Sequence, residues 1–600
     1  MASSVSTPAT IAPGGAPASV ARVVLAAAAR HSGVALRIRA GDGLADTTFA
    51  DLGTAATEIG AGLIELGIRP GDRVGIIGET RPEWTLADCG ALCAGATVVP
   101  VYQTSSPEEC RYVLEHAGVR LVICEDAGQL AKIERIRSDL PALEHVITMV
   151  PVPPALSLDD LRGRAGASPA DAVERALAEV TPDDVATIVY TSGTTGPPKG
   201  CPLTHRNCLA TMSMYERQLE LRAGIVIFMF LPLAHVLARM VQLVALDVGA
   251  TLAYWSRDPK LLLDDLAAAR PTHFPSVPRV YEKVHGRAMA AVAEASPLRR
   301  RVFEWGMATG AAARAAQREG RRAGHLLRAR HRIADRLVLG RVRELFGGAI
   351  ELGMTGAAPI GREVLEFFDA CGVPVLEGYG MTETCAAATL NTPGAVRLGT
   401  VGRPLPGSGL RLDADGEILL RGPNVFGGYH RDPDGTQEIF AGDWLRTGDL
   451  GSIDDDGFVA ITGRKKDLII TSSGKNVAPS NLETALRESR WIAEAVVFGD
   501  NRPYLVALVT LDPDELGALA ERTGAPPDVA TMATDPRVLA ELRADVDAVN
   551  SRFARIEQVK RFAILEQALS QDAGELTPTL KVKRAVVAAR YGDRVDALYA

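Results

Sequence analysis

The chain has 600 residues, of which 47% are hydrophobic and 23% are charged, and its formal net charge is −8. This length exceeds what one ordinary hydrophobic core covers, so we expect at least two domains. The acidic balance argues against a general nucleic-acid binder, and the apolar content argues against a disordered chain.

The amino-terminal segment MASSVSTPATIAPGGAPAS lacks a basic start and a clean apolar stretch. We therefore expect a disordered lead-in over residues 1–19 rather than a signal peptide. Residues 225–255 are the most apolar region, but His235, Arg239 and Asp247 interrupt it, which argues against a membrane span. None of the eight cysteines forms a C-x-x-C pair, a pattern typical of a reducing compartment. These features together indicate a cytoplasmic location.

Short apolar runs alternate with helical patterns in the part of the chain that ends near Tyr190. Helix-like stretches cover residues 49–66 and 84–94, and the runs typical of buried strands are 73–78, 96–102, 121–125 and 185–190. Further strand-like runs follow at residues 249–255, 350–355 and 373–376. Buried strands that alternate with helices predict an α/β layered fold.

Residues 299–344 carry 13 arginines against Glu304, Glu319, Asp335 and Glu344. The Ala- and Leu-rich spacing predicts two or more amphipathic helices with a basic face, as a helical insertion over residues 285–345. A solvated surface is the simpler interpretation. The alternative is peripheral membrane contact through residues 299–344, because basic amphipathic helices bind anionic lipid headgroups.

Turn signals become frequent after Asn391. Asp415-Gly416 and Asp456-Gly457 separate alternating apolar runs, which predicts antiparallel hairpins in a β-rich part over residues 395–463. A smaller unit begins at Arg464, within the sequence GRKKD. Its strand-like runs are 495–498 and 505–511, and a helical pattern covers 538–554.

The strongest chemical signal is the segment YTSGTTGPPKG at residues 190–200. Glycines allow consecutive N–H groups to converge on an anion, while hydroxyls and Lys199 add donors and charge. The segment is not a Walker A motif, because Pro197 and Pro198 follow the second glycine. It predicts a phosphate-binding loop made of Thr191, Ser192, Gly193, Thr194, Thr195, Gly196 and Lys199.

The segment GYGMTET, residues 378–384, follows a predicted strand. Tyr379 offers a flat ring for adenine, while Thr382 and Glu383 offer oxygen atoms near the phosphates. Mg²⁺ prefers a few carboxylate oxygens together with substrate phosphates, so Glu383 is the candidate metal ligand. The alternative is an ordinary loop after the strand.

Asp449 lies in WLRTGDLG, where the neighbouring glycine predicts a turn. A carboxylate there either accepts hydrogen bonds from the two ribose hydroxyls or caps the turn. Arg464 follows shortly after it in the sequence and either pairs with ribose or phosphate oxygens or caps a strand end. Lys581, near the carboxyl terminus, taken alone is typical of a solvated surface charge.

These motifs together resemble the adenylate-forming superfamily of acyl-CoA synthetases, acyl-adenylate ligases and luciferases. FLPLAHV, TGAAP, GKNVAP and TPTLKVKR match it in order, and the resemblance covers the chain from about residue 20 to its end. SVPRVYEKV, residues 276–284, and the basic insertion after it resemble the bacterial long-chain fatty acid–CoA ligase branch.

The resemblance implies an α/β fold in two parts. A large multi-layered N-terminal domain, residues 20–463, would hold two α/β subdomains and a small β-barrel-like subdomain. A smaller mobile α+β domain, residues 464–600, would act as a lid.

The implied reaction joins a long-chain fatty acid to coenzyme A through an acyl-AMP intermediate, with ATP and Mg²⁺. The resemblance assigns Asp449 to the ribose, Arg464 to the nucleotide and Lys581, rather than Lys583, to catalysis together with Thr191 and Glu383. His235 would lie near the reacting carbonyl, although a satisfied core histidine is the alternative. The remaining implied residues are Gly356, Ala357, Gly380 and Met381 for AMP, Lys466 for a hinge, and Gly474, Lys475 and Asn476 for a coenzyme A channel.

Two other functions remain open at this point. One is an acyl-AMP ligase that loads a carrier protein, which the absence of a carrier domain makes the weaker choice. The other is a non-catalytic, nucleotide-binding membrane scaffold. The chain also departs from many relatives at residues 354–360 and at Cys385, so the length and shape of the acyl group stay unassigned.

Overall fold

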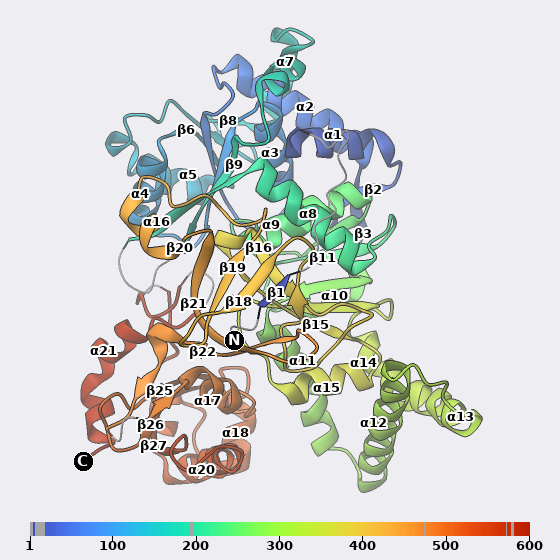
Figure 1. The fold of residues 1–600 in the computed structure, drawn as a ribbon, viewed down its shortest axis with the longest axis vertical. Coiled ribbons are helices and arrows are strands. Elements are labelled where there is room, and N and C mark those ends of the chain that lie inside the picture. Colours follow the sequence, from blue (N-terminus) through green and yellow to red (C-terminus); the bar gives the residue numbers. More distant parts are fainter. Residues whose placement is uncertain are drawn as a thin grey trace.

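The structure is a computed structural model (Figure 1). It describes residues 4–6, 18–41, 43–191, 197–472, 475–571, 573–577 and 581–600. None of the described helices is long and apolar enough to cross a membrane.

A seven-stranded sheet forms the first layer of the described chain. Its strands are β4 Arg73–Ile77, β5 Thr97–Val101, β6 Val119–Cys124, β7 His145–Thr148, β8 Leu156–Ser157, β9 Val185–Thr191 and β10 Lys199–Thr204, in the order β10-β9-β5-β4-β6-β7-β8. All neighbours run parallel except β10, which forms an antiparallel pair with β9. The helices of this part are α1 Val20–Arg30, α2 Phe49–Glu65, α3 Pro82–Cys93, α4 Pro107–Ala117, α5 Ala127–Glu134, α6 Leu158–Gly163 and α7 Ala172–Glu179. The strands and helices expected in this region are confirmed.

Local capping explains where several of these helices begin. Thr48 caps α2, because its hydroxyl accepts a hydrogen bond from the Asp51 N–H while the Asp51 carboxylate accepts one from the Thr48 N–H. Ser106 and Glu109 form the same reciprocal arrangement at the start of α4. Such capping boxes satisfy N–H groups that a helix leaves without partners in its first turn.

A nine-stranded sheet forms the second layer. Its strands are β2 Val34–Ala40, β3 Gly43–Thr48, β11 Val226–Met229, β12 Thr251–Tyr254, β13 His273–Ser276, β14 Leu352–Thr355, β15 Val375–Met381, β16 Ala386–Leu390 and β17 Arg403–Pro404, in the order β17-β16-β15-β14-β13-β11-β12-β2-β3. Its helices are α8 His205–Leu219, α9 Val236–Val248, α10 Leu262–Ala269 and α15 Arg362–Ala370. One hydrophobic core joins both sheets through α1, α3 and α9.

The third sheet is antiparallel and confirms the predicted hairpins. It contains β18 Gly409–Leu412, β19 Glu417–Arg421, β20 Phe440–Ala441, β21 Trp444–Ile453 and β22 Val459–Arg464, and α16 Pro433–Ile439 precedes β20. Gly416 and Gly457, at φ +86° and +82°, form the turns between β18 and β19 and between β21 and β22. Positive φ favours glycine there.

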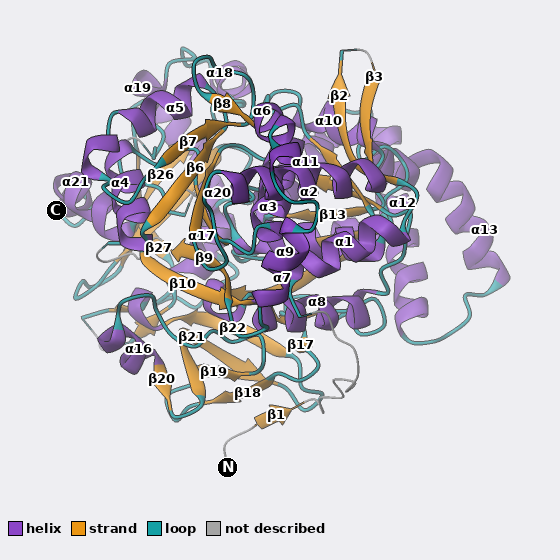
Figure 2. Cartoon of the chain, turned by 90° about the horizontal axis from the view of Figure 1, so that it is seen from above, coloured by secondary structure: helices purple, strands orange, loops and turns teal. Residues whose placement is uncertain are grey.

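The expectation of a disordered lead-in over residues 1–19 is wrong at two described places. Ser4–Ser6 form β1, which pairs antiparallel with β18 (Figure 2). Ser19 is fully buried, and its side chain caps α1 by accepting a hydrogen bond from the Arg22 N–H. The carboxyl end of the lead-in is therefore part of the folded body.

The C-terminal unit has its own sheet and core. β25 Ile492–Phe498 and β27 Val559–Ile564 flank β26 Leu505–Leu511, in which every residue is buried. The other elements are β23 Ile469–Ile470, β24 Asn476–Val477, α17 Pro479–Leu486, α18 Leu516–Thr523, α19 Val529–Met532, α20 Pro536–Asn550 and α21 Arg584–Ala597. The predicted strands and helix of this unit are confirmed as β25, β26 and α20. Figure 1 shows the unit at the lower left of the molecule.

The arginine-rich segment is helical, as predicted. It comprises the end of α11 Pro278–Ala293, α12 Pro297–Arg318, α13 His325–Ala334, a short π-helical turn over Asp335–Leu339 and α14 Gly340–Glu344. Figures 1 and 2 both show α13 projecting away from the body.

His205 links α1 to α8 inside the body. Its side chain is buried, and its Nδ1 accepts a hydrogen bond from the Val20 N–H at 3.2 Å. Burial lowers the pKa of His205 to about 4; Asp184 opposes this shift and Arg239 adds to it. The imidazole is therefore neutral in the folded protein at neutral pH.

We predict that this histidine makes stability fall as the pH drops from about 6.5 toward 4. The unfolded chain, with a histidine pKa of about 6.5, binds a proton that the folded protein does not, which costs about 3 kcal/mol by pH 4. Urea unfolding of the wild type and of His205→Asn across this pH range measures the effect. The variant should lose stability less steeply; parallel curves would contradict the prediction.

Candidate active site

Glu383 lies in a buried setting next to the phosphate-loop hairpin. β15 leads into a short 3-10 turn over Thr382–Thr384, which leaves Glu383 only 6% exposed. The Tyr429 hydroxyl donates a hydrogen bond to Glu383 Oε1 at 2.7 Å. Lys199 Nζ lies 4.7 Å from the centre of the Tyr429 ring. Tyr429 therefore orients the Glu383 carboxylate and carries a cation on its ring face.

The protonation of Glu383 reflects two opposing effects. Burial raises its pKa, while the hydrogen bond from Tyr429 lowers it. A nearby cation stabilises the charged form of a buried carboxylate. Mg²⁺ is usually bound by one or two carboxylates together with phosphate oxygens. The donor chemistry at Glu383 therefore fits the metal role expected for it.

The two ends of the predicted phosphate loop are fixed close to Glu383. Thr191 ends β9 and Lys199 opens β10, and the two residues are paired across the hairpin. β10 also contacts the turn that carries Glu383. Lys199 Nζ lies 3.0 Å from an oxygen of Asp432, which holds the side chain in place. The predicted loop residues Ser192, Gly193, Thr194, Thr195 and Gly196 lie outside the described residues.

Asp449 is held between two partners. The Tyr379 hydroxyl donates a hydrogen bond to Asp449 Oδ2 at 2.6 Å, and Arg464 Nε lies 3.1 Å from Oδ1. Burial raises the pKa of Asp449, whereas Arg464, Tyr379 and Lys581 lower it. The carboxylate thus depends on surrounding donors and cations for its charge.

One expectation about local structure is wrong here. Asp449 does not lie in a turn but within β21, directly opposite Arg464 of β22. Tyr379 and the two residues after it, Gly380 and Met381, continue β15 and are paired with β16, so the alternative of an ordinary loop does not hold for them. The antiparallel pairing of β21 with β22 is what brings Asp449 and Arg464 together. Their separation in the sequence is set by the length of that hairpin.

Lys581 comes from the C-terminal unit and lies within electrostatic reach of this cluster. Desolvation and the charge of Arg464 lower its pKa, while Asp449 raises it. The residue as a whole keeps considerable exposure, so solvent screens part of these effects. Its backbone is fixed by Thr577, whose N–H donates to the Lys581 carbonyl at 2.8 Å.

His235 also lies within electrostatic reach of Lys581. Burial lowers the pKa of His235 to about 4, and the charge of Lys581 contributes to this shift. His235 Nδ1 accepts a hydrogen bond from the Leu237 N–H at 3.2 Å, which caps α9. A neutral imidazole that accepts through Nδ1 carries its proton on Nε2, so His235 offers an N–H donor.

The sequence matches known enzymes along both parts of the chain. Residues 25–430 match the AMP-binding enzyme family, and residues 466–600 match the AMP-binding enzyme C-terminal domain. The chain belongs to the AMP-binding enzyme family. It is 41% identical over 562 residues to the long-chain-fatty-acid–CoA ligase FadD15 of Mycobacterium bovis, with 92% of each chain covered.

Solved structures share the fold of this AMP-binding enzyme. The anthranilate CoA ligase AuaEII in complex with anthranoyl-AMP aligns with a TM-score of 0.74 at 21% identity, covering 97% of this chain and 99% of that chain. The Mycobacterium tuberculosis fatty acyl CoA synthetase aligns with a TM-score of 0.61 at 21% identity, covering 96% and 99%. The expected superfamily and α/β fold class are confirmed.

In this AMP-binding enzyme, Gly356 and Ala357 follow β14 and face the end of β15. A Cβ atom at Gly356 would lie 3.0 Å from the Gly378 carbonyl oxygen, and Ala357 has φ +69°. The side-chain hydroxyl of Thr355, just before them, is buried without a hydrogen-bond partner among the described residues. Small residues at these positions leave room for a flat base, and the roles of Gly356 and Ala357 stay predictions. Thr355 is a polar group that the sequence reasoning did not single out.

The structure places the remaining predicted residues on the C-terminal side of the site. Lys466 lies in the 3-10 turn Lys465–Asp467 that directly follows β22. Lys475 and Asn476 lie at the β23–β24 hairpin and are exposed, while Gly474 is outside the described residues. The hinge and channel roles stay predictions.

A cluster of three acidic residues beside Lys465 is already paired with basic side chains. Within the described part of the chain, Asp413, Asp415 and Glu417 are the one group with carboxylates close enough to share an ion. Lys465 pairs with both Asp415 and Glu417, and Arg446 lies 3.4 Å from Glu417. These two cations offset most of the negative charge of the three carboxylates, so we assign the cluster no metal.

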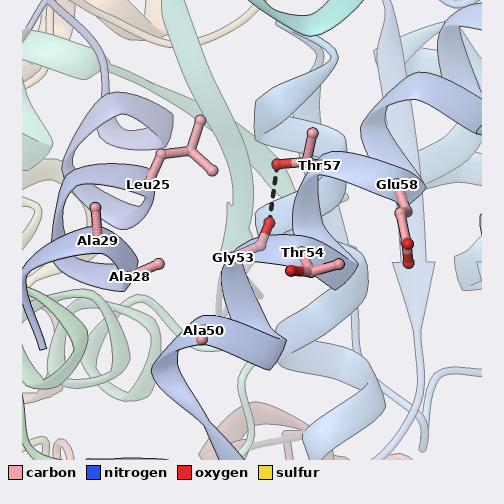
Figure 3. Close-up of a pocket in the computed structure, with 8 residues that line it drawn as sticks. All are labelled: Leu25, Ala28, Ala29, Ala50, Gly53, Thr54, Thr57 and Glu58. Carbon is pink, nitrogen blue, oxygen red and sulfur yellow. Dashed lines mark hydrogen bonds between the residues drawn. The ribbon is translucent and has the colours of Figure 1, made fainter. Parts of the chain in front are cut away.

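An open hollow lies on the surface between α1 and α2 (Figure 3). Small and apolar side chains such as Leu25 and Ala28 line most of it, and the Thr57 hydroxyl donates to the Gly53 carbonyl at 2.8 Å. Glu58 at its edge is paired with Arg162. None of the predicted site residues lines this hollow, so we assign it no role.

Tyr429 is the principal site residue that the sequence reasoning missed. It lies in an irregular segment, FGGYHRDPDG, without strand or helix periodicity. The sequence feature that stands out around Tyr429 is the dense run of Gly, Pro and Asp. This run predicts a turn and does not indicate a binding residue.

We predict that Tyr429→Phe weakens the binding of Mg·ATP by about 10-fold to 100-fold, since it removes the donor that orients Glu383. Calorimetric titration of ATP at several Mg²⁺ concentrations measures the effect. Tyr504→Phe is the matched control, because its hydroxyl donates to the Leu598 carbonyl within the C-terminal unit, away from Glu383. Equal affinities for wild type and Tyr429→Phe would contradict the orienting role.

Proposed function

We propose that the chain is an ATP-dependent long-chain fatty acid–CoA ligase. In the first half-reaction an oxygen of the fatty carboxylate bonds to the α-phosphorus of ATP, and pyrophosphate leaves. In the second, the sulfur of coenzyme A bonds to the acyl carbonyl carbon, and AMP leaves. The observation that carries the proposal is the convergence of Glu383, Asp449, Arg464 and Lys581 in a chain whose curated relatives bear that name.

The nucleotide would be held by groups that the fold fixes in advance. Asp449 keeps acceptor capacity for ribose hydroxyls, because each carboxylate oxygen accepts more than one hydrogen bond. Arg464 would donate to ribose or phosphate oxygens, and the wall at Gly356 and Ala357 would border the base. Glu383 would hold Mg²⁺, which when bound neutralises phosphate charge.

Lys581 and His235 would act at the reacting carboxylate. The Lys581 ammonium offsets the repulsion between the carboxylate and the α-phosphate, and it stabilises the charge that develops during transfer. His235 is neutral with its proton on Nε2, so it would donate a hydrogen bond to an oxygen of the acyl group rather than remove a proton. We infer that it positions the carboxylate.

Product analysis tests the ligase and separates it from the alternatives. Purified protein is supplied with ATP, Mg²⁺ and fatty acids of increasing chain length, with either coenzyme A or a phosphopantetheinyl carrier protein. Acyl-CoA as the main product supports the ligase, with the strongest pyrophosphate release for long chains. Acyl-carrier alone would indicate the carrier-loading ligase, and nucleotide binding without pyrophosphate release would indicate the scaffold.

We predict that Lys581→Ala slows acyl-adenylate formation by about 10²–10³-fold, because one preorganised charge is lost from the transition state. The transfer of a supplied acyl-AMP to coenzyme A should stay close to the wild-type rate. Lys583→Ala, in the same segment, is the control and should keep both rates. Equal loss of both half-reactions in Lys581→Ala would rule out the assigned role.

We further propose that the arginine hairpin, residues 299–344, contacts anionic membranes. On α13 and the turn after it, Leu326, Ile333 and Leu337 recur at helical spacing and are 73%, 54% and 47% exposed. Leu298, at the start of α12, is also 73% exposed. Exposed apolar side chains beside cations are typical of helices that lie in a membrane interface.

The charges of the hairpin support this proposal. Arg314 and Arg318 are engaged by Asp369 of α15, which ties α12 to the body. Within the described residues, no ion pair engages Arg299, Arg301, Arg322, Arg332 or Arg336, so these cations remain for anionic headgroups. A fatty acid substrate partitions into bilayers, and such contact would bring the enzyme to it. The cytoplasmic location stays a prediction.

We predict binding to phosphatidylglycerol vesicles at low salt that weakens as salt is raised, with little binding to phosphatidylcholine. Leu326→Glu combined with Ile333→Glu should reduce co-sedimentation by about 10-fold or more. Leu44→Glu, an equally drastic change at an exposed leucine of β3, is the matched control. The membrane proposal fails if the wild type does not bind at low salt, or if the hairpin variant binds as well as the control.

A further inference from the structure

Two basic side chains on α11 reach across to the C-terminal unit. Arg279 and Lys283 are separated by one helical turn, so they share one face of the helix. Arg279 Nη2 lies 3.2 Å from Asp512 Oδ2, and Lys283 pairs with Asp514. Both cations belong to the segment SVPRVYEKV, and no residue of this segment is assigned to the catalytic cluster. We call these two ion pairs the lid latch.

The acidic side of the latch is rigidly mounted. Asp512 directly follows β26, and its N–H donates to the Trp491 carbonyl at 3.0 Å. Asp512 Oδ1 accepts a hydrogen bond from the Asp514 N–H at 3.0 Å, so Oδ2 is turned toward Arg279. The turn thus presents two carboxylates at fixed positions to two cations on a helix of the body.

A second row of charges lies behind the latch. Glu282 of α11 and Glu494 of β25 are partly buried, and desolvation raises the pKa of each carboxyl. Arg487 of the C-terminal unit and Arg279 of the body lower both of these pKa values. Charges from the two parts of the chain therefore complement each other in this arrangement.

The latch and Lys581 belong to the same rigid piece of chain. The Lys583 N–H donates to the Glu575 carbonyl at 2.7 Å, which closes the segment that carries Lys581. Arg584 Nη2 lies 2.7 Å from an oxygen of Glu483 on α17, which packs against β25. A displacement of the β25–β27 sheet away from α11 would carry Lys581 away from Asp449.

We propose that Arg279 and Lys283 are positioning residues that hold the lid where Lys581 serves acyl-adenylate formation. The proposal rests on the two half-reactions of the proposed function. Transfer to coenzyme A requires other groups at the same centre, so the latch has to open between the two steps. The latch acts through Lys581 and touches no substrate.

The exposure of the latch suits a contact that has to open. The side chains of Arg279 and Lys283 are 42% and 47% exposed, and that of Asp514 is 57% exposed. Ion pairs of this kind shift an equilibrium by factors of about two to five each. The two pairs together bias the lid by roughly tenfold, and thermal motion still separates them.

Charge reversal tests the latch. Lys283→Glu replaces an attraction to Asp514 by a repulsion, and should slow single-turnover acyl-adenylate formation by about 10-fold. Transfer of supplied acyl-AMP to coenzyme A should be unchanged or faster. The double variant Lys283→Glu with Asp514→Lys should restore the first rate, which a merely structural defect would not allow. Lys260→Glu, an exposed lysine of the body, is the matched control.

Lid position is measured separately from activity. Spin labels at Leu261→Cys on the body and Glu521→Cys on α18 report the distance between the two parts, and the native cysteines are all buried. Lys283→Glu should shift the distance distribution, and the double variant should restore it. An unchanged distribution, or equal slowing of both half-reactions without rescue, would overturn the latch. Absence of acyl-adenylate in the wild type would instead overturn the proposed function, while the distances would still test the latch.

Discussion

The buried carboxylate of Asp449 is the point on which the rest of the site depends. Burial raises the pKa of this carboxyl group, and groups from three parts of the chain oppose that shift. Tyr379 comes from the nine-stranded sheet, Arg464 from the antiparallel sheet and Lys581 from the C-terminal unit. The charge of the carboxylate proposed to bind the ribose therefore depends on groups from all three parts of the chain.

On the phosphate side of the site, a second buried carboxylate also has a partner from a distant part of the chain. Glu383 is also buried, and its donor, Tyr429, comes from the segment between β19 and β20 of the antiparallel sheet. Lys199, at the end of the phosphate-loop hairpin, lies over the same tyrosine ring and pairs with Asp432. One tyrosine thus connects the metal candidate to the phosphate loop. Electrostatic interactions are stronger where water is excluded, because the local dielectric constant is lower there.

The ion pairs between the body and the lid differ from these buried interactions in their exposure to solvent. The two ion pairs of the latch at Arg279 and Lys283 are partly exposed and individually weak, as is suitable for a contact that is proposed to open between the two half-reactions. The arginine hairpin is also solvent-facing and lies away from the site in both views of the molecule. The structure therefore combines a buried centre with partly exposed charged surfaces at its periphery.

The sequence by itself determined the local elements and the chemistry of the motifs. Strand β26 coincides with a continuous apolar run, and the Asp-Gly pairs mark the tips of hairpins, because hydrophobic periodicity and turn residues act over a few neighbours. The residue types at Glu383, Asp449 and Arg464 indicated nucleotide chemistry for the same reason. Only the tertiary structure decided that Asp449 faces Arg464 across two strands, that Tyr429 orients Glu383 and that α11 meets the lid. These contacts join residues that are far apart in the chain, and their partners are chosen by sheet register and packing, which no local pattern encodes.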